Sequence, residues 1–219
     1  MRALNLKHFF VWVLLLVTSL PLRADILTNA GEASPSVQIG LQAEKQEQYK
    51  QAYEAYKNAH DKGEDLGTAL MATLLMKGLG VKSDPIKAKL LFEALWRKYY
   101  KPVYTRLDIS NGRILGAPVV VACLGLAELA KKPKNKLKLY LKLQHTFPNI
   151  ISERPDFIPY RVQPIFKMFA AQVFYQIGMC YKNGIGTHVN LKKAKKYLMY
   201  AVGLGNDQAS KALDTLPLD

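Results

Sequence analysis

One short pattern occurs twice in this chain and limits the folds that it can adopt. The stretch LLMKGLGVKSDPIKAKLL contains Gly78 and Gly80, and YQIGMCYKNGIGTHVNLKKAKKYL contains Gly184 and Gly186, 106 positions later (184 − 78). In both copies an apolar segment precedes the glycines and a lysine- and alanine-rich segment follows them. A pattern that returns at a fixed offset is typical of folds built from repeated units.

Other positions at the same offset carry residue types that suit two helices joined by a loop. Asp84 and Asn190 have side chains that accept hydrogen bonds from the first turn of a helix, and Pro85 suits the first helical position. The first glycine of each loop permits the positive φ that ends a helix. Ala88 and Ala194 are small enough for neighbouring helices to approach closely. Each copy is therefore predicted to be a helical hairpin.

A third segment sets the period of the repeat. Apolar residues and alanines recur at steps of three and four, the spacing of one helix face, before a glycine that marks the helix end: Tyr49, Ala52, Tyr53, Tyr56, Ala59 and then Gly63. At an offset of 142 (194 − 52), Ala52, Ala59 and Gly63 align with Ala194, Ala201 and Gly205. The two offsets differ by 36 (142 − 106), a period typical of arrays of helix pairs.

Between the two clear copies lies a degraded one. GAPVVVACLGLAELAKK resembles a first helix, with Gly125 in the place of Gly178, and KNKLKLYLKLQHTF resembles a second helix. The loop between them lacks both glycines. Two stretches near 97–116 and 146–165 are left over, each rich in proline, aromatic residues and arginine, and they are either insertions or further worn helices.

On these motifs the chain resembles the Sel1-like repeat family, whose helical hairpins are similar to tetratricopeptides. The good copies span Gly67–Trp96 and Ala170–Ala209, and Thr187 and Asn190 depart from the Val and Asp of the family pattern. The resemblance implies an all-α solenoid over residues 41–219. It also implies a non-enzymatic scaffold or adaptor that docks a protein or peptide, with a cell-wall-related hydrolase or cell-wall binder as the alternative.

The N-terminus is predicted to direct export. Arg2 and Lys7 precede an apolar run, and a small residue, Ala24, ends the segment, as in a signal peptide over residues 1–24. An uncleaved membrane anchor is the alternative, and residues 25–40 are expected to form a flexible linker. Cleavage changes the formal net charge from +14 to +11, because three basic residues and no acid are lost. We therefore expect a periplasmic or secreted protein that can meet an anionic envelope component but not nucleic acid.

The sequence contains no pattern that predicts catalysis. A phosphate-binding loop needs a strand before its glycines and a Gly-Lys-Ser/Thr at their end, whereas here a helix precedes them. The histidines form no HExxH motif, and Cys123 and Cys180 lie far apart in apolar runs as buried thiols or a disulfide. No cofactor, metal or catalytic residue is predicted, although an inward-facing pair of carboxylates formed by the fold stays open.

The surface candidates are partner-binding residues. The two leftover stretches offer aromatic and arginine side chains, the types enriched in binding hot spots, and the candidates are Tyr100, Tyr104, Arg106, Phe157, Tyr160 and Arg161. Core packing under a long loop is the alternative for them. The lysine cluster Lys192, Lys193, Lys195 and Lys196 is either a solvated helix face or an anion-binding patch.

Overall fold

The computed structural model describes residues 33–100, 117–144 and 164–217. Within these ranges every regular element is an α-helix and no strand occurs. In chain order the helices are α3 (Pro35–Lys45), α4 (Tyr49–Asp61), α5 (Asp65–Lys77), α6 (Pro85–Tyr99), α8 (Ala117–Glu128), α9 (Pro133–Gln144), α10 (Pro164–Asn183), α11 (Leu191–Gly203) and α12 (Asp207–Asp214). The predicted all-α class is confirmed.

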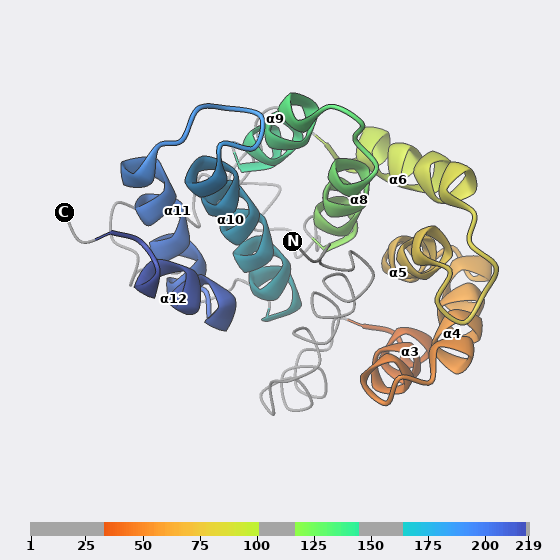
Figure 1. Cartoon of the computed structure of the whole chain (residues 1–219). Coiled ribbons are helices and arrows are strands. Elements are labelled where there is room, and N and C mark those ends of the chain that lie inside the picture. The colour runs from red at the N-terminus through yellow and green to blue at the C-terminus, as the bar shows by residue number, and fades with distance from the viewer. Residues whose placement is uncertain (1–32, 101–116, 145–163, 218–219) are drawn as a thin grey trace, which may run out of the picture.

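The helices follow one another along an arc, with α4, α6, α9 and α11 on its outer side and α5, α8 and α10 on its inner side (Figure 1). Each helix contacts the helix before it in the described sequence, and α8 also contacts α5. Helix packing is therefore sequential. Because successive helices alternate in direction, inner helices end and outer helices begin at one edge of the array, and outer helices end and inner helices begin at the other. We call these the loop edge and the turn edge.

The degraded middle copy is a single helical hairpin, α8 and α9. Helix α8 contacts α5 and α6 on one side and α10 on the other, and α9 also contacts α10. Direct contact on both sides means that no further helix pair of the described residues separates the middle hairpin from its neighbours. Most of the two leftover stretches, at 97–116 and 146–165, lies outside the described residues.

The offset of 142 between copies holds at the level of hydrogen bonds. It maps the first and last residues of α4, Tyr49 and Asp61, onto those of α11. In the turns that follow, Glu64 N–H donates to the carbonyl of Ala59 at 3.0 Å and Asn206 N–H donates to that of Ala201 at 3.0 Å. The glycines in these turns, Gly63 and Gly205, have φ of 80° and 87°. The same turn therefore ends both outer helices.

The inner helices α5 and α8 are apolar on all sides, as expected of helices buried all round. In α5 every residue from Gly67 to Met76 except the half-buried Thr73 is buried, and in α8 so is every residue from Ala117 to Cys123. Because Gly125 has no side chain, its backbone can lie close to the ring of Phe92 on α6. Gly178 instead contacts Leu198 within its own hairpin, so the two glycines, which the sequence alignment made equivalent, have different partners.

The predicted linker over residues 25–40 is wrong in its last part, because α3 begins at Pro35. The Ser34 hydroxyl accepts a hydrogen bond from Val37 N–H at 3.2 Å, and the proline occupies the first turn. Val37 and Leu41 are buried, and Gly40 lies against the ring of Tyr56. The apolar spacing that holds this helix in place spans only two turns and is diluted by polar residues. The predicted signal peptide lies outside the described residues.

Candidate functional site

The two Gly-x-Gly loops have the same backbone geometry. Gly78 and Gly184 both have φ of 69°, which confirms the predicted left-handed end of α5. Asp84 N–H donates to the carbonyl of Leu75 at 2.9 Å, and the equivalent Asn190 N–H donates to that of Tyr181, also at 2.9 Å. The loops are therefore two copies of one structure, with an Asn in place of an Asp at the helix start.

The side chains of Asp84 and Asn190 act as predicted at the N-termini of α6 and α11. Asp84 Oδ1 accepts from Lys87 N–H at 2.9 Å, and Asn190 Oδ1 accepts from Lys193 N–H at 2.9 Å. Ala88 and Ala194, one turn into each helix, are fully buried. The backbone N–H groups of Lys87 and Lys193, of the kind that binds phosphate in a nucleotide-binding loop, are thus hydrogen-bonded within their own hairpins.

The second glycine of each loop contacts the preceding outer helix. A methyl group at Gly80 would overlap the backbone of Tyr49 and Lys50 at the start of α4. A methyl group at Gly186 would overlap the backbone carbonyl of Pro133 at the start of α9. Both glycines also have positive φ, 70° and 74°. The loop edge is therefore where one hairpin rests on the next through backbone contacts that only glycine permits.

Of the six predicted partner-binding residues, the described residues include Tyr100. Its ring stacks on Trp96, with ring centroids 4.3 Å apart and planes inclined by 10°. This half-buried pair lies at the end of α6, at the turn edge. The other five candidates, Tyr104, Arg106, Phe157, Tyr160 and Arg161, lie outside the described residues.

An aromatic cluster that was not predicted from the sequence lies between α10 and α11. Tyr197 stacks on Tyr181 with ring centroids 5.8 Å apart, and it also lies near the rings of Phe174 and Tyr200, which complete this aromatic seam. The Tyr197 hydroxyl donates to Gln144 Oε1 at 2.8 Å, and burial raises the pKa of this phenol. The seam therefore ties the end of α9 to α11. No signal near Tyr197 in the sequence points to Gln144.

Two lysines cover this aromatic seam. Lys193 Nζ lies 5.1 Å from the centroid of the Tyr181 ring, and Lys196 Nζ lies 5.8 Å from that of Tyr200. Both distances are within the range of cation–π attraction. The predicted lysine cluster on α11 is thus part of an aromatic and basic surface.

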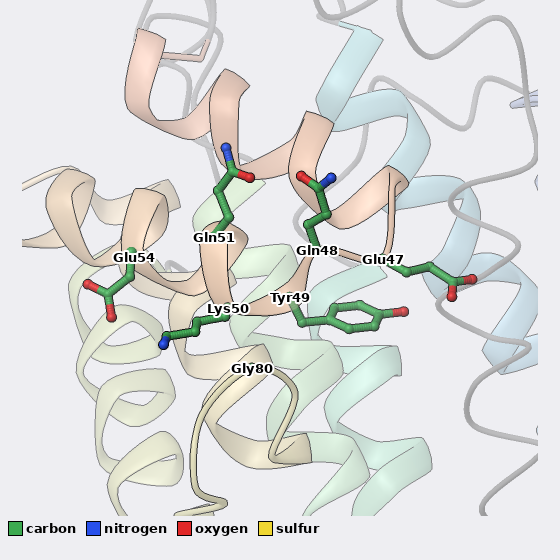
Figure 2. Close-up of a pocket in the computed structure, with 7 residues that line it drawn as sticks. All are labelled: Glu47, Gln48, Tyr49, Lys50, Gln51, Glu54 and Gly80. Atoms are coloured by element: carbon green, nitrogen blue, oxygen red, sulfur yellow. The ribbon is translucent and has the colours of Figure 1, made fainter.

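A shallow depression opens at the start of α4, beside the Gly80 loop (Figure 2). It is lined by Glu47, Gln48, Tyr49, Lys50, Gln51, Glu54 and Gly80. In the close-up, Glu47 and Tyr49 point to one side while Lys50 and Glu54 point to the other. Burial, followed by the carboxylates of Glu47 and Glu44, raises the pKa of Tyr49. The polar groups here diverge and present no pair of carboxylates directed at one point.

The two cysteines are buried, free thiols in the interior of the middle hairpin region, so the structure contains no disulfide between them. Burial raises the pKa of the Cys180 thiol to about 11 and that of Cys123 still further. Burial also raises the pKa of Tyr140, whose phenol lies near both sulfur atoms. These groups are neutral and enclosed at physiological pH, which suits packing rather than nucleophilic chemistry.

The described residues include neither a metal-binding cluster nor a membrane-spanning helix. No three His, Cys, Asp or Glu side chains among them lie close enough together to ligate a metal ion. In the same ranges no helix has the length and apolar character needed to cross a bilayer.

No family model matches this chain, and no curated protein matches it significantly.

Proposed function

We propose that the chain is a solenoid of Sel1-like helical hairpins that serves as a scaffold for a protein or peptide partner. The observation that carries the proposal is the equivalence of distant hairpins. The loops at Gly78 and Gly184 share their φ values and backbone hydrogen bonds, and the turns at Gly63 and Gly205 do the same. Stacked repeats of this kind form extended surfaces suited to binding other chains.

The turn edge is the proposed partner-binding region. Helices α4 and α11 end there in short turns, whereas α6 and α9 lead into the longer stretches 100–116 and 145–163. The helix ends that precede both stretches are held by aromatic side chains, through the Trp96–Tyr100 stack and the hydrogen bond from Tyr197 to Gln144. Helix ends that are already ordered lose less conformational freedom when a partner binds beside them, which favours affinity.

The proposal includes export and excludes catalysis. Residues 1–24 would direct the chain to the periplasm or the cell exterior, and the mature protein would act by holding a partner without a cofactor. N-terminal sequencing of the mature protein tests export, with a start at Asp25 expected. A mature chain that begins at Met1 would overturn cleavage and leave the membrane anchor as the alternative.

A pull-down from envelope extract of a bacterial host that expresses the chain tests the binding role. Tyr104→Ala with Tyr160→Ala should reduce recovery of the partner by tenfold or more, since truncation of two hot-spot residues costs about 2 kcal/mol or more each. The matched control is Ile86→Ala with Leu90→Ala, which removes two exposed apolar side chains from the outer face of α6 and should leave recovery unchanged. Equal recovery by both variants, each folded by circular dichroism, would refute the proposed binding region.

A further inference from the structure

Helices α9 and α11 are successive outer helices of the array, and both pack on α10 (Figure 1). Gly186, in the loop that precedes α11, packs against the backbone of Pro133 and Lys134 at the start of α9. At the end of α9, Gln144 Oε1 accepts a hydrogen bond from the hydroxyl of Tyr197, in the middle of α11, at 2.8 Å. Two contacts separated by about the length of α9 fix the two helices as one outward surface, which we call the α9/α11 face.

This face is uniformly basic. Exposed lysines follow one stripe of each helix, Lys134, Lys138 and Lys142 on α9 and Lys192 and Lys196 on α11. Neither helix contains an Asp or Glu, and the loop over residues 184–190 contains none. Such a surface attracts polyanions over several ångströms at physiological ionic strength.

Apolar side chains stand among these lysines. Val189 is 60% exposed, Met199 49% and Val202 38%, and the last two continue the lysine stripe of α11 at helical spacing. They account for half of the large apolar side chains that the described residues expose, the others being Ile39, Ile86 and Leu90. The α9/α11 face therefore combines positive charge with exposed apolar groups on one surface.

The equivalent surface of the N-terminal repeats shows that the fold does not require this combination. Positions 50, 54 and 57 of α4 correspond to 192, 196 and 199 of α11, and they carry Lys50, Glu54 and Lys57. Lys57 is paired with Asp61 at 2.9 Å. A mixture of positive and negative side chains at these positions of α4 is therefore compatible with the same fold.

Lysines at the start of α11 even act against helix stability. Lys192 and Lys193 occupy its first turn, which holds no acidic residue, so both face the positive end of the helix dipole. The equivalent positions of α6 carry Ile86 and Lys87, so Lys192 is the added charge on α11. Residues that oppose a local stability rule are expected at functional positions.

We propose that the α9/α11 face docks onto a bilayer surface that contains anionic lipids. The lysines would contact lipid phosphates, and Met199, Val202 and Val189 would enter the boundary between headgroups and acyl chains. The face belongs to the outer, convex side of the arc (Figure 1). A convex face can rest on a broad, nearly flat bilayer, whereas an acidic peptide is better held by a groove. The docking surface is distinct from the turn edge proposed for the partner.

Vesicle co-sedimentation of the full chain tests this proposal. The probes are vesicles of equal parts phosphatidylglycerol and phosphatidylcholine, and vesicles of phosphatidylcholine alone. Lys138→Gln with Lys192→Gln should weaken binding to the anionic vesicles by about thirty-fold, because each lysine near an anionic surface contributes about fivefold. The control Lys50→Gln with Lys87→Gln removes the same charge from α4 and α6 and should bind as the wild type does.

A third variant distinguishes lipid from an acidic soluble partner. Met199→Ser with Val202→Ser should weaken binding to anionic vesicles by about tenfold, through loss of apolar burial, and leave binding to soluble polyglutamate unchanged. All variants keep residues 1–24, so differences between them report on the face alone. Equal binding by the Lys138/Lys192 variant and its control would overturn the proposal, as would equal binding to the two kinds of vesicle. Wild-type vesicle binding by the Met199/Val202 variant would also overturn it, in favour of an acidic soluble partner.

Discussion

Replacement of Gly80 by alanine should cost far more stability than replacement of Gly63, although both glycines have positive φ. At Gly63, where φ is 80°, a methyl group would meet nothing within 4 Å. The cost there is the left-handed conformation alone, about 1 kcal/mol. At Gly80, where φ is 70°, the same methyl group would also overlap the backbone of Tyr49 and Lys50.

Backbone atoms cannot rotate out of the way, so the Gly80 loop must move off α4 or the two hairpins must separate. Overpacking of this kind costs about 1–3 kcal/mol, which brings the expected total for Gly80→Ala to about 2–4 kcal/mol. Gly186→Ala should behave in the same way through Pro133, with Gly205→Ala as its control.

Urea unfolding followed by circular dichroism measures the difference, with the free energy of unfolding taken from the midpoint and the slope. If a hairpin detaches before the rest unfolds, the Gly80→Ala transition should also broaden, as in repeat proteins with a weakened interface. Equal midpoints for Gly80→Ala and Gly63→Ala would refute the view that these loops join one unit to the next.

Three further predictions concern local features. Asp84→Ala and Asn190→Ala should each lower stability by about 1 kcal/mol in thermal unfolding, because each removes the side-chain cap of an outer helix, and the two losses should add. Glu47→Gly should raise the free energy of unfolding by up to about 1 kcal/mol, because Glu47 has φ of 59° and glycine adopts this conformation without strain. A lower free energy of unfolding would contradict this. The pKa of the Cys180 thiol rises from 9.0 to about 11 on folding, so the unfolded chain releases this proton first and stability should fall as pH rises from 9 to 11. Cys180→Ala should reduce the slope of that part of the pH profile, and the buried Cys123 thiol should account for part of the slope that is left.

The hairpins could be predicted from the sequence because their signals are local. Gly78 and Asp84 lie six positions apart, and together they specify the end of one helix and the start of the next. Their recurrence at Gly184 and Asn190 makes chance an inadequate explanation. The prediction of α4 succeeded for the same reason, as its apolar face spans a full helix.

What the sequence did not reveal depends on contacts between distant segments. Nothing near Gly80 in the sequence indicates that its lack of a side chain is needed by Tyr49 on the preceding helix. The hydrogen bond from Tyr197 to Gln144 joins residues 53 positions apart, and nothing near either residue indicates the other. Helix α3 was missed at Val37 because its burial depends on α4 rather than on a strong pattern of its own.

The two edges of the array differ in how freely their connections can change length. At the loop edge, Gly80 and Gly186 are seated on a neighbouring helix, so an added residue would displace a whole unit. At the turn edge, a methyl group at Gly63 or Gly205 would meet nothing within 4 Å. Doubling the length of a flexible connection costs only about 0.6 kcal/mol in closure entropy. The turn edge is therefore the side on which such a protein can acquire new sequence, or accept a grafted peptide, while the stack that carries it stays intact.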